Sequence, residues 1–347
     1  MTQIGLLRER LRAAGAKPSH EQRVLRLWAQ GLPQDSGPRR IEDFLPRQLR
    51  DALPGFTAAL GDLAPLVSQH PGRDGSVRLL VRLADGQACE CVLLLRGGLC
   101  VSSQIGCAVG CRFCMTGRDG LLRQIGSAEI VAQVVLARSL RPVKKVVFMG
   151  MGEPAHNLAN VMEAIEFLGT AGNIGHKNLV FSTVGDKRVF QRLPQGPVKP
   201  ALALSLHSTR AALRAELLPR APRIEPADLV EAGDRYARAT HYPMQVQWTL
   251  LDGVNDTPEE AAGLVRLLKG KYAVLNLIPY NSVAGLPFRR PAWDKAEALA
   301  RELHSKGILT KLRDSAGQDI DAGCGQLRAR AAKVLPATQA KQDMINS

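Results

Sequence analysis

Aromatic side chains are scarce in this chain: Phe, Trp and Tyr together make up 4% of its 347 residues. Proteins that bind single-stranded nucleic acid without sequence preference usually stack successive bases on rows of aromatic rings. So few rings argue against a single-strand binder built in that way.

The chain also lacks any uninterrupted apolar run that approaches the length of a membrane-spanning helix, although 45% of its residues are hydrophobic. Charged residues occur throughout its first turns, MTQIGLLRERLRAAGAKPSH, which is unlike a secretory signal. We therefore expect no membrane partner and a cytoplasmic location. In that reducing compartment, the seven cysteines are expected to bind metal or to do chemistry rather than to form structural disulfides.

Acidic residues are outnumbered by basic ones, 32 against 46, which gives a formal net charge of +14. An excess of Lys and Arg favours a polyanionic partner, because each phosphate contact releases condensed counterions. The charge therefore supports a nucleic-acid substrate, while a merely basic protein is the alternative on charge alone.

The first part of the chain predicts helices. Up to about residue 70, apolar residues recur at helical spacing in Ile4–Leu11 and Gln22–Trp28, and Arg40–Leu53 follows with Asp43 and Pro46 as punctuation. We predict a helical accessory domain over 1–74. Residues 75–98 predict a β extension, because two strand patterns flank an Asp-Gly turn at Asp85–Gly86.

From residue 99 strands and helices alternate, which predicts a mostly parallel sheet with right-handed crossovers. Six strand–helix units are too few for a closed eight-stranded barrel, so we expect an α/β fold with a partial (β/α)6 barrel over 99–327, then a basic tail over 328–347. The expected strands are Lys144–Met149, Asn178–Ser182, Leu202–Leu206, Gln245–Leu250, Val274–Ile278 and Ile308–Leu312. The expected helices are Ala128–Ala137, Val161–Leu168, Ala227–Arg238, Pro258–Leu268 and Trp293–Lys306.

Three cysteines form a C-x3-C-x2-C pattern at Cys107, Cys111 and Cys114. Structural zinc sites normally use four protein ligands, and a [4Fe–4S] cluster is normally held by four thiolates. A cluster held by three thiolates keeps one iron open for another ligand. The pattern favours such a cluster, with a zinc knuckle or buried free thiols as the alternatives.

Distinctive polar segments follow the predicted strands, at the end where parallel α/β folds bind ligands. Each is weak evidence alone, since tight turns and structural histidines are common. Together they predict a polar pocket around the cysteine motif. The residues are Gly152 and Glu153 in GMGEP, Ser182 before Thr183, Ser205, Leu206 and His207 in SLHS, and Asn281 in PYN.

The remaining cysteines divide into two groups. Glycines flank Cys324 in DIDAGCGQL, which suits an exposed loop, and Cys100 lies just before the cysteine motif. Cys89 and Cys91 alternate on a strand and are interpreted as packing residues. Glu90 lies between them on the other face, where it could act as a general base if that face turns toward the pocket; a solvated glutamate is the alternative.

Six segments occur in the order CVSSQIGCAVGCRFCMTG, FMGMGEP, LALSLHS, LLDGVND, NLIPYN and DIDAGCGQL. From about Glu90 to Leu327 the chain resembles the radical S-adenosylmethionine RNA methyltransferases of the RlmN/Cfr family, which methylate an adenine ring carbon in 23S ribosomal RNA. The N-terminal segment is similar, more weakly, to the RNA-binding appendage of that family. STVGD departs from the more usual STSG form, and Met115 stands where many relatives have a smaller residue.

The resemblance implies roles for individual residues. Cys107, Cys111 and Cys114 would ligate a [4Fe–4S] cluster. Cys324 would carry a methyl group, Cys100 would form a transient disulfide with it, and Glu90 would accept a proton. The S-adenosylmethionine contacts would be Gly152, Glu153, Ser182, Ser205, Leu206, His207 and Asn281.

The resemblance also implies the overall reaction: two S-adenosylmethionine molecules per turnover, methylation at carbon 2 in preference to carbon 8, and 23S ribosomal RNA with transfer RNA as a second candidate substrate. It further implies a monomer and an electron donor such as flavodoxin or ferredoxin. Two other functions stay open. One is a radical S-adenosylmethionine enzyme that acts on a small molecule, and the other is a non-enzymatic iron–sulfur or zinc protein that binds RNA.

Overall fold

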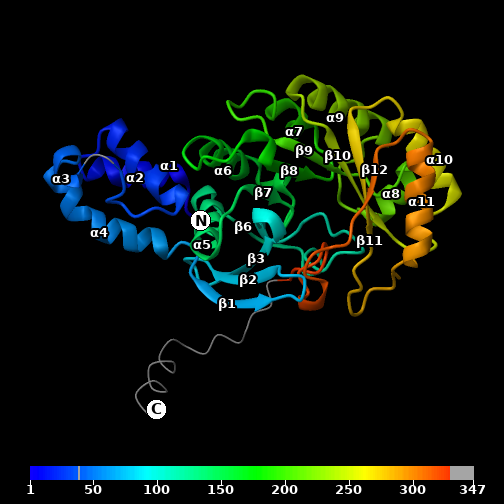
Figure 1. Cartoon of the computed structure of the whole chain (residues 1–347), viewed down its shortest axis with the longest axis horizontal. Coiled ribbons are helices and arrows are strands. Elements are labelled where there is room, and N and C mark those ends of the chain that lie inside the picture. Colours follow the sequence, from blue (N-terminus) through cyan, green and yellow to red (C-terminus); the bar gives the residue numbers. More distant parts are fainter. Residues whose placement is uncertain (38–39, 329–347) are drawn as a thin grey trace, which may run out of the picture.

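The computed structural model describes residues 1–37 and 40–328, and one mixed sheet of ten strands runs through it (Figure 1). Neighbouring strands are antiparallel from β1 to β4 and parallel from β4 to β12. In spatial order the strands are β1 (Leu66–Pro71), β2 (Val77–Arg82), β3 (Ala88–Leu94), β4 (Gly98–Cys100), β7 (Lys145–Phe148), β8 (Leu179–Thr183), β9 (Ala201–Ser205), β10 (Met244–Leu250), β11 (Ala273–Pro279) and β12 (Thr310–Leu312). A separate pair, β5 (Gln104–Gly106) and β6 (Leu121–Gln124), lies beside the sheet.

Helices connect the parallel strands and leave the central strands buried. Every residue of β8 is buried, as expected for a parallel strand with both faces covered. The helices are α5 (Ser127–Leu140), α6 (Leu158–Thr170), α7 (Lys187–Arg192), α8 (Ala211–Leu217), α9 (Pro226–Thr240), α10 (Pro258–Leu268) and α11 (Trp293–Ser305).

The order of strands in the sheet follows the order in the sequence, and among the described strands the end members β1 and β12 do not pair with each other. The sheet is therefore an open, partial barrel. This confirms the predicted α/β fold class, and every predicted strand and helix after residue 99 overlaps an observed one.

The β extension forms the antiparallel end of the sheet. Its predicted turn is present: the Gly86 amide donates to the Leu83 carbonyl at 2.8 Å, and Gly86 has a φ of +83°. One strand was not predicted, because residues up to about 70 read as helical and the structure instead places β1 there, paired with β2. β1 is a mostly exposed edge strand that ends in Pro71, so it carries little hydrophobic pattern.

Four helices make up the N-terminal unit, α1 (Ile4–Ala13), α2 (Pro18–Gln30), α3 (Ile41–Phe44) and α4 (Arg47–Gly61). Pro46 is the residue that precedes α4, in agreement with its predicted role as punctuation. The unit buries its own apolar side chains, including Leu7, Leu25 and Leu49, which are at most 1% exposed.

The chain start fixes these helices to the larger domain. The Thr2 carbonyl accepts from the Ala128 amide at 3.1 Å, and the Ile4 amide donates to the Ser127 hydroxyl at 2.9 Å. One residue further on, the Gly5 amide donates to the Glu163 carboxylate at 3.2 Å. Because these bonds join the chain start to the beginning of α5 and to the middle of α6, the helical unit has a defined position on the sheet domain.

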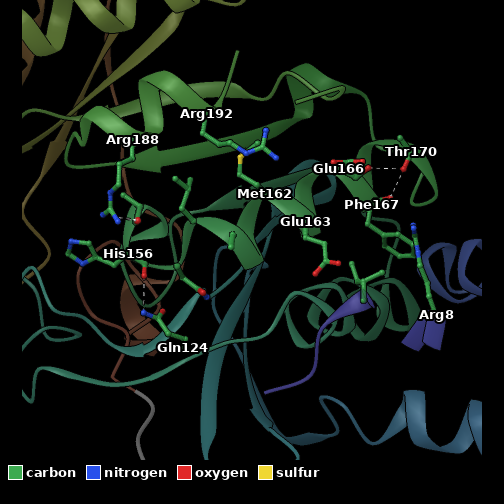
Figure 2. A pocket seen from close by; sticks show the side chains of 15 residues that line it. Arg8, Gln124, His156, Met162, Glu163, Glu166, Phe167, Thr170, Arg188 and Arg192 are labelled. Atoms are coloured by element: carbon green, nitrogen blue, oxygen red, sulfur yellow. Dashed lines mark hydrogen bonds between the residues drawn. The ribbon is translucent and has the colours of Figure 1, made fainter. Parts of the chain in front are cut away.

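An open cavity of about 750 Å³ lies along this junction, and Figure 2 shows Arg8 from α1 at one end and His156 with Arg188 at the other. Glu163 projects into the region between them. The junction therefore carries several cationic side chains beside the accessory helices.

No helix among residues 1–37 and 40–328 is long and apolar enough to cross a membrane. The predicted basic tail lies outside the described residues, apart from Arg328.

Candidate active site

A pocket of about 280 Å³ opens at the carboxyl ends of the parallel strands. Ten of the residues singled out in the sequence line it together. They come from six separate segments of the chain: Cys100, Cys107, Cys111, Cys114, Gly152, Glu153, Ser182, Ser205, His207 and Cys324. Three others, Glu90, Leu206 and Asn281, are not part of its wall.

Residues 107–117, here called the thiol loop, form one wall of the pocket. The Cys107 amide donates to the Gly120 carbonyl at 2.9 Å, which closes the loop on itself. The Met115 amide donates to the Gly325 carbonyl at 2.8 Å, and the Thr116 hydroxyl donates to the Leu327 carbonyl at 2.7 Å. The three cysteines are thus held against the segment that carries Cys324.

Residues 313–328, here called the Cys324 loop, bring the Cys324 thiol into the pocket. The side chain is open to solvent from inside the pocket, yet the surrounding protein and the neighbouring Cys114 together raise the pKa of the thiol to about 11. Burial raises the pKa of Cys100 to about 12, and charge on Cys324 adds to that rise. Cys324, Cys100 and Cys114 therefore line one pocket.

Cys100 reaches the pocket because of its register in the sheet. It ends β4 and pairs with Val92 of β3, and both residues line the pocket. Cys89 and Cys91 occupy the opposite face of β3 and are completely buried in the main hydrophobic core. This confirms that these two cysteines pack.

Glu153 is a buried carboxylate at the end of β7. Its two oxygens accept from the Ala155 amide at 3.1 Å and the Val184 amide at 3.0 Å. Burial raises its pKa to about 7, although hydrogen bonds from Thr183 and the two amides lower it. Gly152 precedes it with a φ of +99°, and a Cβ there would lie 2.5 Å from the Gln104 side chain, so only glycine fits.

His207 lies in the pocket as a neutral imidazole. Its Nδ1 accepts from the Thr249 amide at 3.0 Å, which leaves the proton on Nε2. Burial, together with the nearby Arg214 cation, lowers its pKa to about 3. The ring packs edge-on against Phe113 of the thiol loop, with centroids 4.9 Å apart. A neutral Nε2–H group can donate a hydrogen bond to a ligand.

Asn281 and Leu206 act at one remove from the pocket. Asn281 is 2% exposed, and its Nδ2 donates to the Cys324 carbonyl at 3.0 Å and to the Ser315 hydroxyl at 2.9 Å. Leu206 is completely buried, and its amide donates to the Gln247 carbonyl at 3.1 Å. Asn281 therefore holds the Cys324 loop, and Leu206 holds β9 against β10.

Glu90 is buried rather than solvated, with 1% of its surface exposed. It shares its face of β3 with Val92, which lines the pocket, but its carboxylate forms an ion pair with Arg78 and accepts from the Arg328 amide at 2.9 Å. The face turns toward the pocket, as the functional interpretation requires, and the carboxylate reaches the end of the Cys324 loop.

Known proteins with similar sequences and a similar fold agree with this arrangement of the pocket. Residues 101–265 match the family model of the radical SAM superfamily. Probable RNA methyltransferases from Leptothrix cholodnii and an Azoarcus species are 73% and 72% identical to the chain, and each alignment covers 94% of both proteins. The crystal structure of a radical SAM methyltransferase from Sphaerobacter thermophilus superposes with a TM-score of 0.81 at 35% identity, over 94% of this chain and 98% of that one.

The chain belongs to the radical SAM superfamily. The superfamily implies a [4Fe–4S] cluster and S-adenosylmethionine, and the thiol loop lies within the matched residues. Membership of the superfamily also agrees with the open, mostly parallel sheet.

The donor set fits the cluster that a radical SAM protein carries. Burial raises the pKa of Cys107, Cys111 and Cys114, that of Cys107 to about 12, so iron would have to displace a proton from each. Within 1–37 and 40–328 no three Cys, His, Asp or Glu side chains are grouped to hold a single metal ion. The superfamily match therefore favours a cluster over a zinc knuckle at the thiol loop.

Two polar residues of the radical SAM site were missed in the sequence. Gln104 accepts from the Glu153 amide at 2.7 Å and donates to the Gln124 side chain at 2.9 Å, which links the strand end to β6. Arg214 is 3% exposed, and its charge acts on Cys111 and Glu153 while burial lowers its pKa to about 10. Gln104 lies in the quoted cysteine segment, but Arg214 lies in an ordinary helical pattern that gives no signal.

Proposed function

We propose that this radical SAM protein is an RNA methyltransferase that adds a methyl group to an adenine ring carbon by way of a methylated Cys324. The observation that carries the proposal is the meeting of Cys324 and Cys100 in one pocket with the three cysteines of the thiol loop. The relatives named probable RNA methyltransferases and the net charge of +14 support RNA as the substrate.

Three thiolates would hold the cluster and leave one iron open. When bound, the cluster would supply the electron that cleaves S-adenosylmethionine to methionine and a 5′-deoxyadenosyl radical, and would take back the electron that the adenine adduct later loses. Glu153 would accept from the ammonium group of the cofactor, the His207 Nε2–H would donate to it, and Gly152, Ser182 and Ser205 would lie along it.

Cys324 would act first as a nucleophile. Its thiolate takes the methyl group of one S-adenosylmethionine, which leaves as S-adenosylhomocysteine, and the thiol proton goes to solvent. The methyl group then loses a hydrogen atom to the radical from a second S-adenosylmethionine and forms a carbon–carbon bond with the adenine ring. Adenine carbons 2 and 8 are electron-poor, so a carbon radical can add where a methyl cation would not react.

Glu90 and Cys100 would complete the turnover. Glu90 takes the proton from the attacked ring carbon. The Cys100 thiolate then attacks the Cys324 sulfur, the carbon–sulfur bond breaks, and the methylated adenine takes up a proton. The Cys100–Cys324 disulfide that remains must receive two electrons before the next turnover, and we expect a flavodoxin or ferredoxin to supply reducing equivalents.

The substrate in this proposal is 23S ribosomal RNA, with transfer RNA as a second substrate and carbon 2 as the favoured position. The target adenine must be unpaired or flipped to reach the pocket. The accessory helices, with Arg8 beside the junction cavity, would contact the RNA backbone.

The test is reconstitution under anaerobic conditions with methyl-labelled S-adenosylmethionine and ribosomal and transfer RNA, followed by nucleoside mass spectrometry against both methyladenosine isomers. Wild-type protein should produce 2-methyladenosine. Cys324→Ala should bind iron normally but form no methyladenosine, whereas Cys111→Ala should lose the iron. Full methylation by Cys324→Ala would contradict the proposed route.

A further inference from the structure

We propose that Arg78 is a positioning residue that clamps the Cys324 loop to the β extension, so that Cys324 faces the thiol loop and Cys100. This role rests on the proposed function of Cys324. Arg78 was not singled out in the sequence, and it does not line the pocket.

Arg78 joins two separate parts of the site. Its Nε donates to the Ile320 carbonyl at 2.8 Å, and its Nη1 is bonded to the Glu90 carboxylate. The second Glu90 oxygen accepts from the Arg328 amide at 2.9 Å. One buried ion pair thus holds the Cys324 loop four residues before Cys324 and four residues after it.

The pair is built into the sheet. Arg78 of β2 and Glu90 of β3 lie on the same face of neighbouring antiparallel strands, since Arg78 is opposite Val92 and Glu90 is opposite Leu80. Both side chains are nearly inaccessible to solvent, 8% exposed for Arg78 and 1% for Glu90. The two side chains are held in fixed orientations, because neither partner can turn to water without leaving the other charge unpaired.

The turn between β1 and β2 adds a second hold on the same loop. The Asp74 carboxylate accepts from the Gly317 amide at 2.9 Å, and the Arg73 amide donates to the Asp319 carboxylate at 2.9 Å. Figure 1 shows the loop lying against β2 and β3. The β1–β2 turn and the β extension therefore contact the Cys324 loop at several points, and Arg78 contacts it closer to Cys324 in sequence than the turn does.

Arginine suits this position better than lysine. Its guanidinium presents N–H groups in two separate directions, one toward Ile320 and one toward Glu90, whereas a lysine ammonium is a single point charge. Arg78→Lys keeps a cation for Glu90 and weakens the hold on Ile320. Release of the loop by a fraction of the pocket width would move the methyl group away from the radical without disturbing the thiol loop ligands.

The experiment compares Arg78→Lys with Arg82→Lys, an exposed residue on the same strand and face. The reconstituted enzymes are assayed for 5′-deoxyadenosine and methylated RNA, and hydrogen exchange is measured over residues 314–328. For Arg78→Lys we expect unchanged iron content and cofactor cleavage, about a tenfold rise in 5′-deoxyadenosine formed per methyl group transferred, and faster exchange in the loop. Arg82→Lys should match wild type in all three.

Equal product ratios and equal exchange in the two variants would overturn the clamp. If Arg78→Lys does not hold its fold, the double variant Arg78→Gln/Glu90→Gln removes both buried charges, and exchange in its loop decides alone: wild-type exchange rates there refute the clamp. Failure of wild-type protein to methylate RNA refutes the proposed function, while the exchange comparison still tests whether Arg78 holds the loop.

Discussion

The side-chain amide of Asn281 donates to the main-chain carbonyl of Cys324 at 3.0 Å. The same amide donates to Ser315 at 2.9 Å, so one buried residue after β11 joins both halves of the Cys324 loop. The loop is therefore fixed by side chains from two ends of the sheet, although its sequence is rich in small residues.

Asn281→Ala should loosen that loop. Two hydrogen bonds from a buried amide are lost, which should lower the free energy of unfolding by about 1–3 kcal/mol. RNA methylation should fall about 10-fold or more in kcat because Cys324 is misplaced, while the KM for S-adenosylmethionine stays unchanged. Ser282→Ala, at the exposed neighbour, serves as the control. A selective rise in KM would instead show direct contact with the cofactor.

Cys100→Ala should stop the reaction with RNA still attached to the protein. Without the Cys100 thiolate, nothing breaks the bond between the Cys324 sulfur and the carbon joined to adenine. Gel electrophoresis and mass spectrometry after nuclease digestion should find adenine-modified Cys324 in up to one equivalent. Cys91→Ala, on the other face of the neighbouring strand, should give no adduct; an adduct-free, fully active Cys100→Ala enzyme would exclude Cys100 from the reaction.

Glu153 predicts a pH dependence in the stability of the cluster-free protein. Burial raises its pKa from 4.5 to about 7, so the folded state binds the proton more tightly than the unfolded state does. The stability from that proton is complete below pH 4.5 and is lost as pH rises to about 7, an amount of about 3 kcal/mol at most.

Glu153→Gln isolates this effect, because glutamine has the shape of the protonated acid and does not titrate. The difference in free energy of unfolding between wild type and variant, from urea unfolding at several pH values, should favour wild type most at pH 4.5. As the pH rises to 7, the wild type should lose this stability advantage over the variant. A difference that stays constant over this range would show that Glu153 titrates normally.

Gly126→Ala should separate the accessory helices from the sheet domain. A Cβ at Gly126 would lie 2.1 Å from the Thr2 carbonyl oxygen, and this oxygen also accepts the Ala128 amide. Overpacking of this kind costs about 1–3 kcal/mol, measurable by thermal unfolding. Gly61→Ala has open space around its Cβ and should be neutral. Equal stability of the two variants would mean that the chain start is not held at Gly126.

Much of the fold was predictable because the central strands are short apolar runs, and amphipathic helices such as α9, α10 and α11 lie between or after several of them. Ten of the predicted site residues line the pocket, since segments such as those of Glu153 and His207 come after parallel strands whose ends meet in space. The edge strand β1 was missed because exposed residues on an edge need no apolar pattern.

The contacts between loops could not be predicted in the same way. The bond from Asn281 to the Cys324 carbonyl depends on a backbone atom, which any residue at position 324 would offer. The Arg78–Glu90 pair depends on the register of β2 against β3, and alternation alone does not say which polar residues on one face meet. Asn281 was expected in the pocket wall. It lies behind the wall instead, because its side chain bonds to the Cys324 carbonyl, a contact that the sequence pattern does not reveal.

The bonds of Thr2, Ile4 and Gly5 to the sheet domain set a fixed separation between the accessory helices and the pocket. A nucleic acid bound to the helices would present to the pocket only those bases that lie at a matching distance from the bound part. Under the proposed function, distance along the substrate would then contribute to the choice of base, through three residues at the chain start.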